Sequence, residues 1–301
     1  MHSYDVLTIG NYTKDTIVSA AGTRYVHGGG YSYAAHAAAI RNLRVGAVTR
    51  LAAADRGSTE ALVARGVEVH VFESPSSTLM RLEYPTANVD ERVLTVAAVA
   101  DPITPELLAD FSARAFLVSG SLRGELPLAT MQLLRGKGGL LAADLQGFIR
   151  IREGSGRLAY APWPEQRDVL ALVDILKTDA VEAEFLTGHA DIHRAAAALA
   201  RQGPAEIVLT HRDGLLVLVD GRYHGAPFKP DALCGRSGRG DTCIGAYTSA
   251  RLELEPGEAM LWAAAATSLK LEAEGAVTAS ADDVRRVLAA RYSDDVQCAS
   301  A

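Results

Sequence analysis

Residues 234–247 read Cys-Gly-Arg-Ser-Gly-Arg-Gly-Asp-Thr-Cys-Ile-Gly-Ala-Tyr. Three glycines within six residues, Gly235, Gly238 and Gly240, disfavour both a helix and a strand. The residues that follow Asp241 have the apolar spacing of a packed helix. The stretch therefore predicts a glycine-rich loop that leads directly into the N-terminus of a helix.

This junction is suited to binding an anion. Unpaired backbone N–H groups and the positive end of the helix dipole point to one place, an arrangement that favours phosphate. An isolated carboxylate at the position of Asp241 would be a helix cap. Next to a phosphate-binding loop, the same carboxylate can also take the proton from an attacking hydroxyl. The arrangement indicates phosphoryl transfer to an alcohol.

The segment Gly238-Arg239-Gly240-Asp241 resembles the Gly-Ala-Gly-Asp signature of the ribokinase-like (PfkB-type) carbohydrate kinases. The resemblance implies that Asp241 is the catalytic base and that Gly238, Arg239 and Gly240 form the anion hole. Two positions depart from the family: Gly235-Arg236 replaces the usual Asp-Thr, and Arg239 replaces the usual Ala. We expect Arg239 to reach the phosphates of ATP, the alternative being a surface ion pair.

The resemblance covers nearly the whole chain. It implies one domain, residues 1–301, with a three-layer α/β/α fold, a central mostly parallel sheet and a small β lid. The lid strands are expected at about 12–27 and 76–98, where segments 78–84 and 92–97 alternate around Pro85-Thr86-Ala87-Asn88.

Composition restricts the class of partner. A net charge of −6 and a pI near 5.8 argue against a nucleic-acid surface, which needs a concentrated excess of Lys and Arg. The apolar runs are too interrupted for a membrane span. Three cysteines without metal-like spacing, and no charged-then-apolar leader, favour the cytoplasm.

Two segments are candidates for the acceptor pocket. The resemblance places Asp15 on hydroxyls of the acceptor, and it places Gly29 and Gly30 where the substrate approaches the backbone. Tyr33 stands at one of the two possible positions of the family's Asn. Asp144 and Gln146 leave a predicted strand, where open α/β sheets bind ligands. The simpler alternative for each carboxylate is a turn that satisfies backbone N–H groups.

Two further segments are candidates for the donor site. Asp179 and Glu182 share a helix face and resemble the family's Asn-x-x-Glu motif, which implies a water-mediated magnesium site. Two carboxylates there could also only complement the helix dipole. Thr210 and Gly214 partly resemble the Thr-x-Gly-x-x-Gly turn that contacts nucleotide phosphates.

The sequence therefore predicts magnesium- and ATP-dependent phosphorylation of a hydroxyl on a small sugar or polyol, possibly similar to inositol. The alternatives are a nucleoside kinase of the same fold and an inactive relative that only binds a sugar or nucleotide. The expected partners are small molecules, with neither nucleic acid nor membrane, and the expected state is a monomer or a homodimer.

Overall fold

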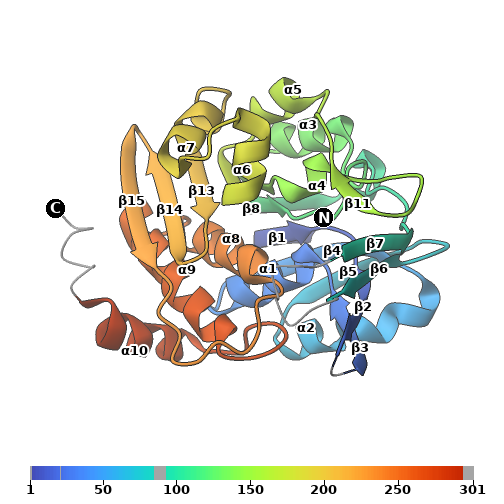
Figure 1. Ribbon diagram of the computed structural model, residues 1–301, viewed down its shortest axis with the longest axis horizontal. Coiled ribbons are helices and arrows are strands. Elements are labelled where there is room, and N and C mark those ends of the chain that lie inside the picture. The colour runs from blue at the N-terminus through green and yellow to red at the C-terminus, as the bar shows by residue number, and fades with distance from the viewer. Residues whose placement is uncertain (1, 21, 85–92, 294–301) are drawn as a thin grey trace.

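The computed structural model describes residues 2–20, 22–84 and 93–293 (Figure 1). In this part of the chain the main sheet has nine strands in the order β15-β14-β13-β12-β9-β8-β1-β4-β5. Their bounds are β1 His2–Ile9, β4 Val45–Leu51, β5 Glu68–Glu73, β8 Phe111–Val118, β9 Leu140–Asp144, β12 Ile175–Asp179, β13 Glu206–Thr210, β14 Gly214–Val219 and β15 Arg222–Pro227. All neighbouring pairs are parallel except β13 with β14 and β14 with β15. The predicted mostly parallel sheet is confirmed.

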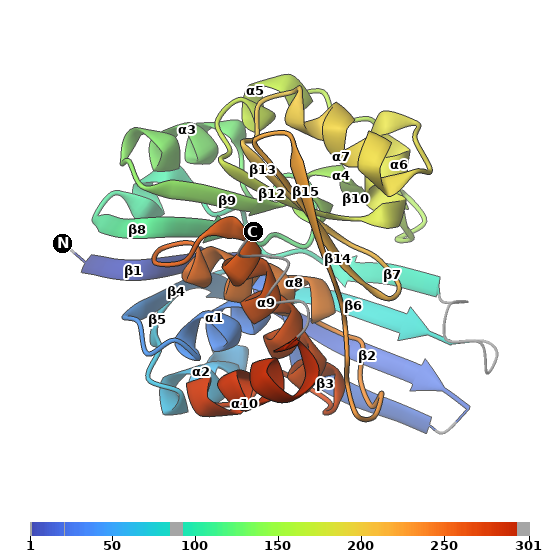
Figure 2. The same ribbon diagram turned by 90° about the vertical axis from the view of Figure 1, so that its left-hand side faces the viewer.

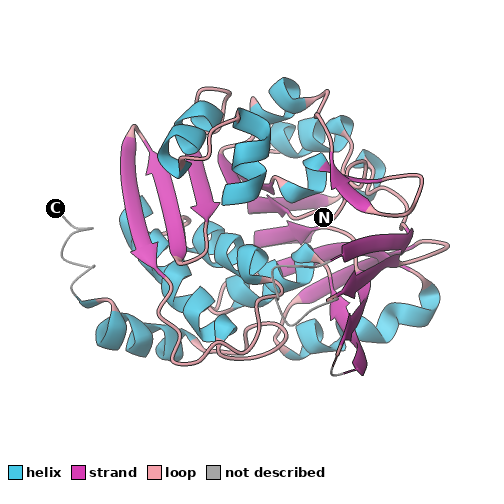
Figure 3. Cartoon of the chain, viewed as in Figure 1, coloured by secondary structure: helices cyan, strands magenta, loops and turns pink. Residues whose placement is uncertain are grey.

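Helices cover both faces of the main sheet (Figures 2 and 3). One face carries α3 Leu128–Gly136, α5 Gln166–Leu170, α6 Ala180–Thr187 and α7 Ile192–Ala200. The other carries α1 Gly30–Ala39, α2 Glu60–Ala64, α8 Arg239–Ala250, α9 Pro256–Leu271 and α10 Ala281–Arg291. Each side of the sheet has its own hydrophobic core. Met131 and Leu199 belong to one core, and Tyr247 and Trp262 belong to the other. The central strands are therefore apolar on both faces.

The strand order reverses beside β1. The chain adds β4 and β5 on one side of β1, and then places β8, β9, β12 and β13 on the other. Ligands of open α/β sheets bind at such a reversal, beyond the carboxyl ends of the strands. The topology therefore predicts a site close to the ends of β1 and β8.

A separate four-stranded sheet has the order β3-β2-β6-β7. Its strands are β2 Thr13–Ser19, β3 Gly22–Gly28, β6 Thr78–Glu83 and β7 Val93–Ala98. They fall within the ranges expected for the lid, and their closing over a substrate stays a prediction. The expected turn at Pro85-Thr86-Ala87-Asn88 and the first residue of segment 92–97 lie outside the described residues.

Several smaller elements differ from the sequence predictions. The connection from β4 to β5 consists of a 3-10 helix, Ala53–Thr59, followed by the short α2. The structure also contains elements that were not predicted: a second 3-10 helix, Pro105–Leu108, the short helix α4 Gln146–Ile149, and the hairpin of β10 Arg150–Arg152 and β11 Leu158–Tyr160. None of these elements has the long apolar repeat on which a sequence prediction depends.

Helices α1 and α8 pack closely and in parallel. The Cα of Gly245 lies against the backbone of Ala34, while four residues earlier in each helix Gly30 lies against Asp241. This register brings both helix N-termini to the same end of the sheet. Small residues permit the approach, since Ala34, Ala37 and Ala38 of α1 are fully buried.

We predict that Gly245→Ala lowers the thermal midpoint. A Cβ on Gly245 would lie 2.7 Å from the Ala34 Cα, and such overpacking costs about 1–3 kcal/mol, more than the roughly 1 kcal/mol of helix propensity that Ala gains. Gly136→Ala is the matched control, because a Cβ there meets nothing within 4 Å. Calorimetric melting should separate the two variants, and equal midpoints would contradict the proposed packing constraint.

Candidate active site

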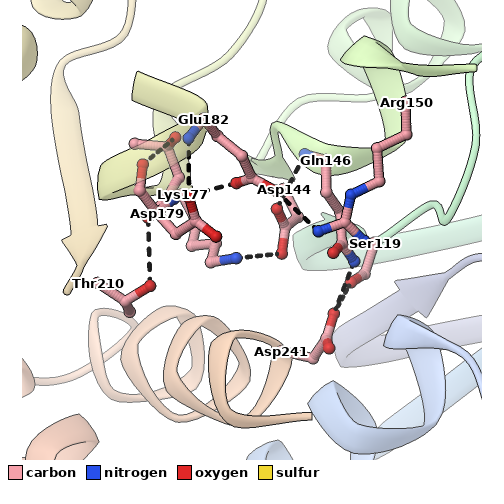
Figure 4. Close-up of polar contacts among 10 residues, drawn as sticks. Ser119, Asp144, Gln146, Arg150, Lys177, Asp179, Glu182, Thr210 and Asp241 are labelled. Carbon is pink, nitrogen blue, oxygen red and sulfur yellow. Dashed lines mark hydrogen bonds and ion pairs between the residues drawn. The ribbon is translucent and has the colours of Figure 1, made fainter. Parts of the chain in front are cut away.

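Polar side chains gather at the carboxyl ends of the central strands (Figure 4). Ser119 directly follows β8, Asp144 ends β9 and Asp179 ends β12. The N-terminus of α8 brings Asp241 to the same region, where Figure 4 shows it facing Ser119 and Gln146. The predicted residues of the α8 loop and of the β9 exit are therefore neighbours in space.

The carboxylate of Asp241 is held through one oxygen. Ser119 Oγ donates to Oδ1 over 2.8 Å, and Gln146 Nε2 donates to the same atom over 3.3 Å. Within the described ranges Oδ2 has no hydrogen-bond partner. Because one oxygen is fixed and the other is open, the carboxylate is oriented to accept a proton.

The first glycine loop touches Asp241 directly. A Cβ on Gly30, the first residue of α1, would collide with Asp241 Oδ1 and with Ser119 Oγ. Gly29 precedes it with a φ of 104°, which favours glycine. The N-terminus of α1 thus lies beside the carboxylate, a position in which a helix dipole stabilises an anion.

Tyr33 lies between the two loops. Its ring occupies the space that a Cβ on Gly238 would need, and Gly238 has a left-handed φ of 76°. Burial, and then the negative charges of Asp15 and Asp241, raise the pKa of Tyr33 to about 12. Tyr33 is thus a neutral phenol close to both carboxylates.

A buried ammonium lies under the α8 loop. Lys177 Nζ is 2.9 Å from Asp144 Oδ2, and a Cβ on Gly240 would lie 2.5 Å from the same Nζ. Burial opposes the charge of Lys177, but the carboxylates of Asp144, Glu182 and Asp241 outweigh it and hold its pKa above the ordinary value. The ammonium therefore stays charged next to the predicted anion hole.

Asp179 and Glu182 form a capping box at the start of α6. Glu182 N donates to Asp179 Oδ1 over 2.8 Å, and Asp179 N donates to Glu182 Oε2 over 3.0 Å. Arg150 Nη2 donates to the other oxygen, Glu182 Oε1, over 3.0 Å. Both oxygens of Glu182 are thus engaged by the protein, and its magnesium role stays a prediction.

Asp15 lies on β2 of the small sheet. Its Oδ1 is inaccessible to solvent and has no hydrogen-bond partner in the described part of the chain. Burial raises the pKa of Asp15 to about 6, although a hydrogen bond from Thr13 opposes the shift. An unsatisfied buried carboxyl oxygen is costly unless a ligand pairs with it.

The remaining donor-site candidates, Thr210, Gly214 and Arg239, contact other parts of the protein. The buried Thr210 hydroxyl donates to the Thr178 carbonyl over 3.4 Å. Gly214 begins β14, where a Cβ would collide with the backbone of Ala226. The Arg239 guanidinium lies 5.8 Å from the centre of the Phe228 ring. Contacts of these residues with a nucleotide stay predictions.

Sequence analysis missed Ser119, Arg150 and Lys177. A signal was present for Lys177, because a lysine that follows two apolar residues in the strand Ile175–Asp179 needs a partner if it is buried. Ser119 follows a strand, the same position that identified Asp144. Arg150 carries no local signal, since its role depends on the distant Glu182.

The fold is an α/β fold with polar side chains at the carboxyl ends of its central strands, and comparison with known proteins identifies the family of carbohydrate phosphotransferases to which it belongs. The model of the pfkB family carbohydrate kinases matches residues 8–283. The chain belongs to the pfkB family of carbohydrate kinases. A search of curated protein sequences found no match.

Solved structures give the same fold. A pyrophosphate-dependent kinase of the ribokinase family, complexed with a pyrophosphate analog and myo-inositol, is 30% identical with a TM-score of 0.86, over 93% of this chain and 99% of that chain. A pyrophosphate-dependent myo-inositol-1 kinase, converted by mutation into a myo-inositol-3 kinase, is also 30% identical with a TM-score of 0.86, over 95% and 99% of the chains. Arabidopsis thaliana ribokinase with ribose and ATP is 19% identical with a TM-score of 0.76, over 96% and 99%. The ribokinase-like fold is thereby confirmed.

We predict that acceptor binding depends on the ionisation of Asp15. An ionised carboxylate accepts two hydroxyl hydrogens, so the acceptor KM should rise as the pH falls through about 6. The pKa of Asp15 is higher in the folded protein than in the unfolded chain. Folding stability therefore falls as the pH rises from 3.8 to about 6 and Asp15 ionises. Asp15→Asn should therefore be no less stable at pH 7, with a high acceptor KM that does not vary over this range. A normal KM in that variant would identify Asp15 as a turn residue.

Proposed function

We propose that this kinase phosphorylates a hydroxyl of a small cyclic polyol of the myo-inositol type. The observation that carries the proposal is the geometry of Asp241, whose Oδ1 is fixed by Ser119 and Gln146 while Oδ2 is open beside the α8 loop. The polyol acceptor is supported by the 30% identical kinase that was complexed with myo-inositol.

Each part of the site has a role in the proposed reaction. The acceptor hydroxyl gives its proton to Asp241 Oδ2, and its oxygen forms a bond to the transferred phosphorus. The anhydride bond to the leaving phosphate breaks. Backbone N–H groups of residues 238–240 and the Lys177 ammonium stabilise the charge on the transferred group. Asp15 and the Tyr33 hydroxyl hold the other hydroxyls of the acceptor.

The donor is a phosphoanhydride. The sequence predicts ATP, whereas the two 30% identical structures are of pyrophosphate-dependent kinases. Pyrophosphate is therefore the second candidate. Both donors present a phosphoryl group to the same loop, so either is consistent with the proposed chemistry.

Magnesium is compatible with the donor site. Among the described residues, no group of three or more His, Cys, Asp and Glu is arranged to hold a metal ion. Magnesium bound with phosphates needs only one or two carboxylates and otherwise keeps its waters. Asp179 can supply one, since its Oδ1 caps α6 and Oδ2 has no hydrogen-bond partner in the described segments. When bound, magnesium would neutralise charge on the donor phosphates.

None of the helices in the described ranges is long and apolar enough to span a bilayer.

We predict that Asp241→Asn lowers turnover by about 10²–10⁴-fold, the usual effect of removing a general base. The near-isosteric amide still accepts from Ser119, so the thermal midpoint and donor affinity should stay close to those of the native protein. The assay measures release of ADP or phosphate with ATP or pyrophosphate, across a panel of cyclic polyols, sugars and nucleosides.

Near-native turnover in Asp241→Asn would refute the assignment of the base. A native protein that turns over no acceptor with either donor would support the inactive relative. Turnover of nucleosides alone would support the nucleoside kinase.

A further inference from the structure

An ion pair joins the small sheet to the main body of the protein. Arg24 of β3 donates through Nη1 to Glu274 Oε2, across 250 positions of the sequence. Glu274 lies in the loop that follows α9. The chain enters the hairpin of β2 and β3 at Thr13 and leaves it at Gly28, which pair with each other, whereas Arg24 pairs with Ile17 farther out. The ion pair therefore holds the outer half of this hairpin.

Glu274 is in contact with the loop that leads to the predicted anion hole. A Cβ on Gly235 would lie 2.9 Å from the Ala273 carbonyl oxygen and 3.2 Å from the Glu274 Cα, so the two backbones touch. Lys270 Nζ joins them, since it donates to the carbonyl oxygens of Gly235 over 3.1 Å and of Ala273 over 3.3 Å. The partner of Arg24 is thus fixed to the segment that continues into α8.

Arg24 is also close to the acceptor side of the candidate site. Burial and the negative charges of Asp15 and Asp241 raise the pKa of Tyr33 to about 12, and the positive charge of Arg24 opposes this shift. The Tyr33 ring in turn packs against Gly238 at the start of α8. Arg24 therefore lies near the phenol that separates the small sheet from the α8 loop.

The exposure of this ion pair suits a contact that forms and breaks. The side chains of Arg24 and Glu274 are 52% and 59% exposed, so water can replace either partner at small cost. Opening a buried pair, such as that of Lys177 with Asp144, would instead leave unpaired charges in the interior. The pair of Arg24 and Glu274 can thus open each time that an acceptor enters or a product leaves.

We propose that Arg24 and Glu274 form a latch that retains the acceptor, because they fasten the outer half of the β2–β3 hairpin to the support of the α8 loop. This inference rests on the proposed function, which places the acceptor between Asp15 and Asp241. Asp15 lies on the same hairpin, so opening the latch moves its carboxylate away from the acceptor. Arg24 is a positioning residue, since it acts through the hairpin and not on the reacting atoms.

Calorimetric titration of the full chain with myo-inositol tests the latch. Arg24→Ala should weaken binding about two- to fivefold, which corresponds to the roughly 0.5–1 kcal/mol of an exposed ion pair. Arg24→Glu should weaken it further, because two carboxylates then repel each other. The double variant Arg24→Glu/Glu274→Arg should recover most of the affinity. In the steady state the acceptor KM of Arg24→Ala should rise by a larger factor than kcat changes.

Hydrogen exchange of the protein without ligand tests the same latch independently of activity. Amides of β2 and β3 should exchange about two- to fivefold faster in Arg24→Ala than in the native protein, and the double variant should reverse the change. Arg44→Ala is the matched control. Arg44 and Glu68 form an ion pair of similar exposure, 57% and 48%, at the amino ends of β4 and β5, far from the carboxyl ends where the site lies. Thermal midpoints establish that each variant is folded.

Two results would overturn the inference: native myo-inositol affinity in both Arg24 variants, or an equal loss of affinity in Arg44→Ala. Polyol phosphorylation by a native protein whose Arg24 variants keep native affinity and exchange would leave the proposed function standing without the latch. If Arg24→Ala opens the hairpin but the native protein neither binds nor phosphorylates a polyol, the latch stands and the proposed function fails.

Discussion

The close parallel packing of α1 and α8 is the constraint on which the site depends. Because Gly245 has no side chain, α8 can approach the backbone of Ala34 and align its N-terminus with that of α1. The two glycine loops, about 200 residues apart in the sequence, then meet around Asp241. Gly30 leaves room for the carboxylate, and Gly238 leaves room for the Tyr33 ring. These glycines therefore serve close packing as well as the backbone conformations that glycine favours.

The second feature is a set of buried charges that compensate one another. Lys177 pairs with Asp144, and Arg150 pairs with Glu182, at the ends of adjacent strands and the start of α6. Burying such pairs rarely adds stability, because desolvation offsets most of their attraction. Charged groups at the carboxyl ends of the central strands are typical of a ligand site, and we propose that these fixed charges face a phosphorylated donor.

The resemblance to the carbohydrate kinases predicted the fold class and the mostly parallel sheet, whereas the local spacing of glycines and apolar residues predicted the glycine loops. The sequence also singled out Asp241 and Gln146, which the structure joins by a hydrogen bond. The resemblance included the range of β3 in the lid, but the sequence pattern alone did not mark it, since an exposed edge strand has no alternating buried face. The site positions of Lys177 and Ser119 depend on contacts with residues that are distant in the sequence. These contacts cannot be inferred from one sequence before the order of the strands is known.

We propose that the buried ammonium of Lys177, next to the α8 loop, stabilises the transferred phosphoryl group. The most direct measurement compares kcat of Asp144→Asn with that of the double variant Lys177→Met/Asp144→Asn. The double variant removes both members of the ion pair, so the loss of Lys177 does not leave the buried Asp144 carboxylate without a partner. We expect kcat to fall at least about a hundredfold from the single to the double variant while the thermal midpoint is retained, a loss typical of removing one preorganised stabilising group. Equal kcat in the two folded variants would contradict it.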